Sequence, residues 1–209
     1  CKGYRSGGGK AMAVVCPGTL LEQWRVLELC IAADAIIIMQ AANTGLTEGS
    51  APSGIYDRAV VVLSTNRMCK IHMIKDGEQI IAFPGATLYA LEEQLKPLNR
   101  QPHSVIGSSC VGASIVGGVC NNSGGSLIER GPSYTELSLT AKVDQNGVLE
   151  LINHLGINLG NNPETILTRL EAGDFNENDF EYSESIASDK EYRNQVRDID
   201  NETPARFNA

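Results

Sequence analysis

The sequence has no hydrophobic run long enough to cross a lipid bilayer. A membrane-spanning helix needs about 20 consecutive apolar residues, whereas the longest apolar stretches here, residues 35–39 and 59–63, are long enough only for β-strands. With 209 residues, of which 42% are hydrophobic, the chain can bury one sizeable core or two small ones. The composition therefore predicts a globular chain that is soluble by itself.

An initiator methionine, a charged leader and an apolar signal region are also missing. The sequence starts at Cys1 and reaches strand-like sequence by Ala11, which favours a truncated start. A lipid attached to Cys1 is the alternative, but no precursor sequence is present to support it.

Clusters of lysine and arginine, which binding to nucleic-acid phosphates requires, do not occur in any stretch. The net charge is −8, and residues 161–209 carry most of it, with twelve acidic and five basic side chains. This balance argues against a nucleic-acid partner. For residues 161–209 it predicts an acidic excursion or a linker to further sequence.

The sequence has no C-x-x-C pair, and we expect no metal site. The cysteines lie mostly in apolar surroundings, which predicts free, buried thiols in a reducing compartment. They are Cys1, Cys16, Cys30, Cys69, Cys110 and Cys120.

Hydrophobic periodicity predicts a β-α-β unit at the start of the chain. Residues 11–16 form a strand, and residues 20–32 form a helix with one apolar face. Thr19 and Glu22 have the spacing of a capping box at the start of this helix. The apolar face consists of Leu20, Trp24, Leu27 and Ile31. Residues 35–39 are short and continuously apolar, so we expect a buried strand parallel to the first.

Strand and helix signals continue beyond this unit and begin a second sheet. The expected elements are strands at residues 59–63, 70–74 and 79–83, a helix with Leu88, Leu91 and Leu95 on one face, and hairpin strands at residues 137–143 and 148–152. The turn residues Asp144–Gly147 join the hairpin strands. After Gly160 the apolar periodicity fades, apart from Ile166, Leu167 and Leu170.

The first candidate site is the stretch QAANTGLTEGS at residues 40–50, which directly follows a buried strand. Gly45 and Gly49 allow positive φ angles and let a ligand approach the backbone. The hydroxyl side chains that suit phosphate oxygens are Thr44, Thr47 and Ser50. A pyrophosphate fits this pattern without a lysine, and an ordinary glycine turn is the alternative.

The second candidate site is residues 102–125, PHSVIGSSCVGASIVGGVCNNSGG, with six glycines among small residues. Residues 113–119 can form a short helix whose N-terminal amides face a ligand, together with Gly107–Ser109. A tightly packed helix with glycines for close approach is the alternative. Neither site has Walker spacing, and no Rossmann glycine pattern follows a strand.

The chain resembles the FAD-binding domain of the quinone-dependent, membrane-associated D-lactate dehydrogenases, which is of the vanillyl-alcohol-oxidase type. The resemblance covers almost the whole chain and rests on both glycine-rich stretches, on YRSGGGKAMAVVCPGTLLEQWRVL and on RDIDNETPARFNA. It implies an α+β, two-subdomain FAD-binding fold. A small β-α-β subdomain (residues 1–66) precedes a larger mixed-sheet subdomain with helices (residues 67–160), and an acidic excursion (residues 161–209) follows.

The resemblance also implies which residues bind FAD, held noncovalently in the enzymes that this chain resembles most. The residues on the pyrophosphate-contacting loop are Ala41, Ala42, Asn43, Thr44, Gly45, Gly49 and Ser50. The residues at flavin-contacting positions of the second stretch are Gly107, Ser114 and Gly124. Because His103 and Cys110 lie near these positions, covalent attachment is an alternative.

The implied activity is oxidation of D-lactate to pyruvate, with electrons passed to quinone in the respiratory chain. A substrate-binding cap and a membrane-contacting region would follow this chain. They would place the enzyme peripherally at the cytoplasmic face of the bacterial plasma membrane. The alternatives are a dehydrogenase of another 2-hydroxy acid, such as glycolate, and a catalytically inert flavin-binding fragment.

No catalytic base can be assigned from these residues. His72 and His154 lie in or after expected strands, which favours structural roles, and His103 adjoins the second site. Arg130 could meet a carboxylate or a phosphate, although a surface ion pair is the more usual role.

Overall fold

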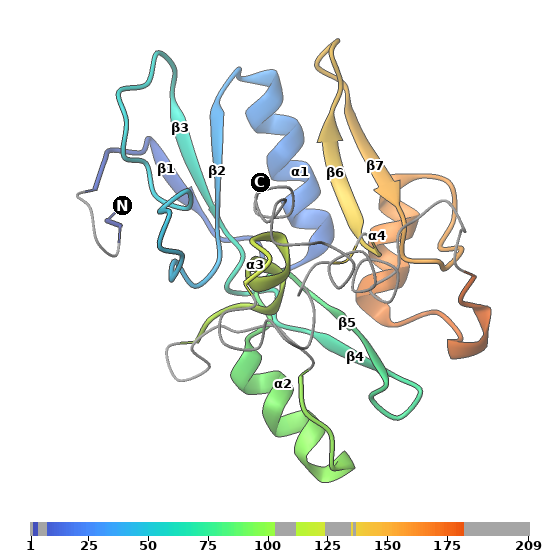
Figure 1. Ribbon diagram of the computed structural model, residues 1–209. Helices are drawn as coiled ribbons and strands as arrows, with labels where there is room; N and C mark the ends of the chain where they lie inside the picture. The colour runs from blue at the N-terminus through green and yellow to red at the C-terminus, as the bar shows by residue number, and fades with distance from the viewer. Residues whose placement is uncertain (1, 4–7, 103–111, 124–134, 136, 182–209) are drawn as a thin grey trace, which may run out of the picture.

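The computed structural model describes residues 2–3, 8–102, 112–123, 135 and 137–181 (Figure 1). Its first unit contains β1 (Ala13–Val15), α1 (Leu20–Ala32), β2 (Ile36–Gln40) and β3 (Val60–Ser64). The three strands form a parallel sheet in the order β1-β3-β2. The central strand β3 is buried along its whole length, as its continuously apolar sequence predicts. The predicted β-α-β unit is confirmed, but the prediction of a buried strand at residues 35–39 was wrong, because β2 is an edge strand in which only Ile38 is buried.

Helix α1 begins at the predicted cap. The Thr19 hydroxyl oxygen accepts a hydrogen bond from the Glu22 backbone N–H (3.1 Å), and the Glu22 carboxylate accepts one from Gly18 N–H (2.6 Å). The second bond thus reaches one residue before the N-cap. The buried face of α1 consists of Trp24, Leu27 and Cys30. Cys30, and not the predicted Ile31, is the buried residue in the last turn.

The strands after residue 66 are antiparallel pairs. β4 (Ile71–Ile74) pairs with β5 (Gln79–Ala82), and β6 (Leu139–Val143) pairs with β7 (Leu149–Asn153). The helices in this part are α2 (Leu88–Leu95), α3 (Ile115–Cys120) and α4 (Pro163–Ala172), with 3₁₀ turns at Lys96–Leu98 and Glu177–Asp179. Parallel and antiparallel sheets beside several helices confirm the α+β class.

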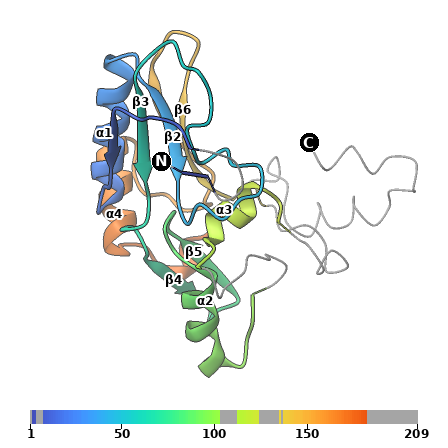
Figure 2. The ribbon, with the colours of Figure 1, turned by 90° about the vertical axis from the view of Figure 1, so that its left-hand side faces the viewer.

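A hydrophobic core joins the β4–β5 hairpin to α4. Its buried members are Met68, Ile74, Ile81, Phe83, Ile157, Leu159, Ile166 and Leu170. Figure 2 shows α4 beside α1 on one side of the strands, and the Leu20 N–H donates to the Glu171 carboxylate (3.1 Å). Residues 163–172, within the predicted acidic excursion, therefore contribute to the packed core.

A tight turn at Pro84–Gly85 connects this core to the end of β3. The Gly85 N–H donates to Met68 O (2.9 Å), and the Thr65 hydroxyl donates to Pro84 O (3.2 Å). A Cβ added to Gly85 would lie 2.1 Å from Thr65 O, so this position has room only for glycine. The turn holds the end of the parallel sheet against the β4–β5 hairpin.

The helices α2 and α3 start side by side. Their N-cap residues, Thr87 and Ser114, form an isolated antiparallel bridge. Leu88 N–H donates to Ala113 O, and Ile115 N–H donates to Ala86 O, both at 2.9 Å. The buried cluster across them consists of Ala86, Leu88, Leu91, Leu95, Ala113 and Ile115. This bridge sets where the second glycine-rich stretch enters its helix.

The cysteines differ from the prediction of buried thiols. Cys30 is buried, and burial raises the pKa of its thiol. Cys16, Cys69 and Cys120 are exposed, so the prediction was wrong for these three. Apolar neighbours in the sequence did not predict burial of these cysteines, because residues at the ends of strands and helices can reach solvent even in apolar segments.

Among the described residues, no helix is long and apolar enough to span a membrane.

The turn of the β6–β7 hairpin makes folding stability depend on pH. Asp144 Oδ1 accepts hydrogen bonds from the backbone N–H groups of Val148 and Asn146 (both 2.8 Å), and these bonds, that of Val148 foremost, lower the pKa of Asp144. A lowered pKa stabilises the fold above the unfolded-state pKa, and this stabilisation is lost as pH falls through the folded-state pKa. We therefore expect Asp144→Asn to lower the melting temperature slightly at neutral pH but not at the acidic end of a pH series. An equal difference at every pH would contradict this role.

Candidate functional site

The first predicted site lies at the carboxyl end of the edge strand β2. The last backbone hydrogen bond between β2 and the neighbouring β3 segment runs from Thr65 N–H to Gln40 O (2.9 Å). Residues 41–50 then leave the sheet as a loop, which we call the cofactor loop. Ligands of parallel sheets bind outside the carboxyl ends of the strands, because loops and free backbone groups meet there. The loop is therefore in a position suited to a ligand.

Side chains within the cofactor loop bond to one another and close it. Gln40 Nε2 donates to Ser50 O (2.7 Å), and the Ser50 hydroxyl donates to Asn43 Oδ1 (2.7 Å). The backbone adds Glu48 N–H to Gly45 O (3.3 Å) and Ala51 N–H to Glu48 O (3.0 Å). Asn43 and Ser50 thus shape the loop with their side chains, a role that sequence reasoning did not assign to them.

The left-handed backbone positions of the loop are not the predicted ones. Positive φ angles occur at Asn43 (55°) and Glu48 (56°), and neither Gly45 nor Gly49 has one. The prediction that these glycines supply positive φ was therefore wrong. Asparagine tolerates this region because its side chain bonds locally, but a glutamate there is uncommon and costs energy.

The two glycines instead leave open space beside the backbone. No atom of the described residues lies within 4 Å of a Cβ added at Gly45 or Gly49. Within the described part of the chain, no hydrogen bond is donated by the backbone N–H groups of Ala41, Ala42, Asn43, Thr44 and Gly45. Backbone amides without such a partner suit an anion, since they can donate without a positive side chain. The loop therefore fits the pyrophosphate of FAD.

The second predicted site is described only around α3. Ser114 is the N-cap, and its hydroxyl oxygen accepts from Gly117 N–H (3.2 Å), while Ile115 N–H donates to Ala86 O. The prediction that the N-terminal amides of this helix face a ligand was therefore wrong for the backbone N–H groups of Ile115 and Gly117. A Cβ at Gly117 would lie 2.6 Å from the Ser114 hydroxyl oxygen, so this glycine makes room for the cap. Ser114 is buried, and its hydroxyl hydrogen can still be donated.

Several predicted residues lie outside the described part of the chain. These are Gly107 and Gly124, together with His103, Cys110 and Arg130. Figures 1 and 2 both place α3 on the same side of the strands as the turn that follows β2. The helix α3, which Ser114 caps, therefore lies on the same side of the strands as the cofactor loop.

The structure shows the positions of two of the three histidines, His72 and His154. His72, in β4, has Nε2 3.1 Å from Leu170 O, and its ring packs edge-on against Phe83 and Phe175. The backbone N–H of His154 donates to Ser138 O (2.8 Å). Across the described ranges, no group of three or more histidine, cysteine or acidic side chains could hold a metal ion. The contacts of the His72 ring agree with the structural role predicted for it, whereas His154 is exposed and its predicted role stays a prediction.

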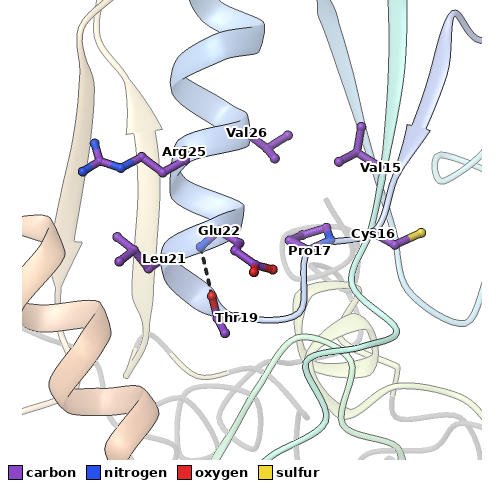
Figure 3. Close-up of a pocket in the computed structure, with 8 residues that line it drawn as sticks. All are labelled: Val15, Cys16, Pro17, Thr19, Leu21, Glu22, Arg25 and Val26. Carbon is purple, nitrogen blue, oxygen red and sulfur yellow. Dashed lines mark hydrogen bonds between the residues drawn. The ribbon is translucent and has the colours of Figure 1, made fainter.

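A hollow of about 630 Å³ lies at the start of α1, between this helix and β1 (Figure 3). Its apolar lining includes Val15, Pro17, Leu21 and Val26. The charged side chains at its edge are engaged, because Glu22 accepts from Gly18 N–H and Arg25 pairs with Glu28 (2.9 Å) and Glu164. The charged groups at the edge of the hollow are therefore already paired with other residues.

The chain is similar in sequence to enzymes of known name. The chain is 59% identical over its full length to the quinone-dependent D-lactate dehydrogenase of Escherichia coli (strain K12) and 54% identical over 99% of its length to that of Haemophilus influenzae. It is 46% identical over its full length to that of Corynebacterium glutamicum. The chain spans only about 37% of the length of the first two relatives and 36% of the third.

Solved structures of low sequence identity share the fold. An alkyldihydroxyacetonephosphate synthase superposes with a TM-score of 0.53 at 22% identity, covering 69% of this chain and 27% of that one. A p-cresol methylhydroxylase superposes with a TM-score of 0.52 at 17% identity, covering 86% of this chain and 32% of that one. Residues 11–143 match the family profile described as FAD binding domain. The predicted resemblance is thereby confirmed, and the chain belongs to this family of FAD-binding domains.

Proposed function

We propose that this chain is the FAD-binding part of an enzyme that oxidises D-lactate to pyruvate and passes the electrons to quinone. The observation that carries the proposal is the cofactor loop, in which five backbone amides have no partner among the described residues and no described atom lies near an added Cβ at either glycine. Identities of 46–59% to enzymes named quinone-dependent D-lactate dehydrogenase support the choice of substrate and electron acceptor.

In this proposal, residues 1–66 and 67–160 form two subdomains with FAD between them. The pyrophosphate contacts Ala41, Ala42, Asn43, Thr44, Gly45, Gly49 and Ser50, and the flavin contacts Gly107, Ser114 and Gly124. FAD is held noncovalently in this proposal, as the resemblance implies, and attachment through His103 or Cys110 is the alternative. Amide groups bind the pyrophosphate charge, and the closed shape of the loop keeps them oriented.

Bound FAD supplies the hydride acceptor for the α-carbon hydrogen of the hydroxy acid, whose hydroxyl proton passes to a base, and quinone finally takes up the electrons. The contribution of this chain is to bind and orient the cofactor. The base that accepts this proton is left unassigned in the proposal.

Partners and location follow from the same proposal. The partners are a small 2-hydroxy acid and quinone, and nucleic acid is not among them. The enzyme associates peripherally with the cytoplasmic face of the bacterial plasma membrane, through regions beyond those that this chain shares with its relatives. Since the chain spans about 37% of two of those relatives, we expect the isolated chain to have no turnover of its own.

The first test is retention of flavin. The purified chain is incubated with FAD, desalted and examined for absorption bands at about 370 and 450 nm, as expected for bound oxidised flavin. In the full-length protein, D-lactate should then bleach these bands faster than L-lactate or glycolate does. A full-length protein without flavin would refute the proposal, and faster bleaching by glycolate would reassign the substrate.

A further inference from the structure

The described residues at the start of the chain lie against the cofactor loop. Lys2 and Gly8 form an isolated antiparallel bridge, so Lys2–Gly3 and Gly8–Gly9 run side by side. We refer to these four residues as the N-terminal strip. The Asn43 side-chain Nδ2 donates to Lys2 O (3.0 Å), which links the strip directly to the loop.

Two glycines of the strip lie close to the loop and its continuation. A Cβ at Gly9 would lie 2.0 Å from Pro52 O, which is a backbone atom. A Cβ at Gly3 would lie 2.6 Å from the Glu48 carboxylate oxygen Oε2, and Glu48 is only 7% exposed. The strip therefore packs on the loop at both ends of residues 43–52.

These contacts reach the strained and closing positions of the loop. Asn43 and Glu48 are its two positive-φ residues, and strained backbone persists only where the surroundings hold it in place. Asn43 also accepts the hydrogen bond from Ser50, so one side chain connects Lys2 to the loop closure. Displacing the strip would change the same residues that set the direction of the loop amides.

We propose that the N-terminal strip is a positioning element that fixes the cofactor loop in its FAD-binding conformation. The proposal rests on the proposed function, because it assigns the strip to the same cofactor site. The strip itself supplies no group to the cofactor in this proposal, and it acts through Asn43, Glu48 and Pro52.

The first test uses Gly9→Ala, with Gly54→Ala as the matched control. A Cβ at Gly54 would lie 3.6 Å from the Tyr56 ring, an ordinary contact, so the control leaves the loop unchanged. In the 209-residue chain without FAD, amide hydrogen exchange is measured at Ala51, whose N–H is bonded within the loop, and at Gly77 in the β4–β5 turn as an internal reference. We expect Gly9→Ala to speed exchange at Ala51 on the order of tenfold and to leave Gly77 unchanged.

The same variants are then compared for FAD affinity. We expect Gly9→Ala to weaken binding by on the order of tenfold, because a misplacement of binding groups by about 1 Å can cost up to roughly a hundredfold. Unchanged exchange at Ala51 would overturn the proposal. Faster exchange with unchanged FAD affinity would overturn the positioning role. If the 209-residue chain binds no FAD, faster exchange at Ala51 would still support the contact between the strip and the loop. The affinity comparison would then be made in the full-length protein. Failure of the full-length protein to bind FAD would refute the proposed function itself.

A double-mutant cycle covers the case in which Gly9→Ala does not fold. The Cβ added by Gly3→Ala would contact the end of the Glu48 side chain. Glu48→Gly removes this side chain and also the backbone strain, because glycine tolerates a positive φ. We expect Gly3→Ala to speed exchange at Ala51 and weaken FAD binding in the native background, but to have no effect on either in the Glu48→Gly background. Equal effects in both backgrounds would show that the Gly3–Glu48 contact does not set the loop, against the proposal.

Discussion

Replacing Gly45 with valine should weaken FAD binding by roughly a hundredfold, about 2.8 kcal/mol, while the melting temperature of the FAD-free protein stays the same. No atom of the described residues lies within 4 Å of a Cβ added at Gly45, so we expect the folded chain to accommodate the side chain. In the proposed site this is the space that the pyrophosphate occupies, and branched methyl groups there would keep it from the amides of residues 41–45. Affinity is measured by titration of the apoprotein with FAD, with flavin fluorescence as the signal.

The matched control is Gly54→Val, another exposed glycine without a positive φ, whose Cβ would meet only the Tyr56 ring at 3.6 Å. It should leave FAD affinity within about twofold of the native value, since it is a surface change away from the cofactor loop. Equal affinities of the Gly45 and Gly54 variants would place the pyrophosphate elsewhere. A fall in the FAD-free melting temperature for Gly45→Val alone would show that the glycine serves the fold.

Replacing Gly85 with alanine should destabilise the fold by about 3 kcal/mol, the upper end of what overpacking costs. The added Cβ would lie 2.1 Å from Thr65 O and 3.0 Å from Met68 O, and both are backbone atoms that hydrogen bonds hold in place. To relieve the clash, the turn must separate from the end of β3. For a chain of this size the melting temperature should fall by roughly 6–12 °C.

The control for this experiment is Gly49→Ala, because a Cβ there meets nothing within 4 Å and its φ is not positive. Its melting temperature should match the native value within about 2 °C, or rise slightly through the lower entropy of the unfolded chain. A Gly85→Ala protein as stable as this control would mean that the Pro84–Gly85 turn does not hold the parallel sheet against the β4–β5 hairpin.

Features that depend on neighbours along the chain were predictable. The Thr19 cap, the β6–β7 turn and the buried strand β3 each arise from residues within a few positions of one another, and the structure contains all three. The position of the cofactor loop was predictable for the same reason, because a glycine-rich stretch after a buried parallel strand must emerge at its carboxyl end. Likeness to known FAD-binding sequences supplied the cofactor, which these patterns alone did not.

Features that depend on contacts between distant segments were not predictable. Asn43 and Glu48 adopt positive φ where glycines were the expected residues, and the Asn43 side chain is bonded to Lys2, which lies far away in the sequence. The first amides of α3 are used by Ala86 and Ser114, and α4 packs on the core although its sequence is rich in charge.

The sequence by itself therefore determined the elements, their order and the identity of the FAD-binding family, since these are set by local hydrogen bonding, periodicity and recognisable motifs. Only the tertiary structure decided which amides are bonded among the described residues, which glycines have open space beside them and which make room for backbone. Those outcomes depend on packing between residues far apart in the chain, where an approach of a few tenths of an ångström decides whether a side chain fits.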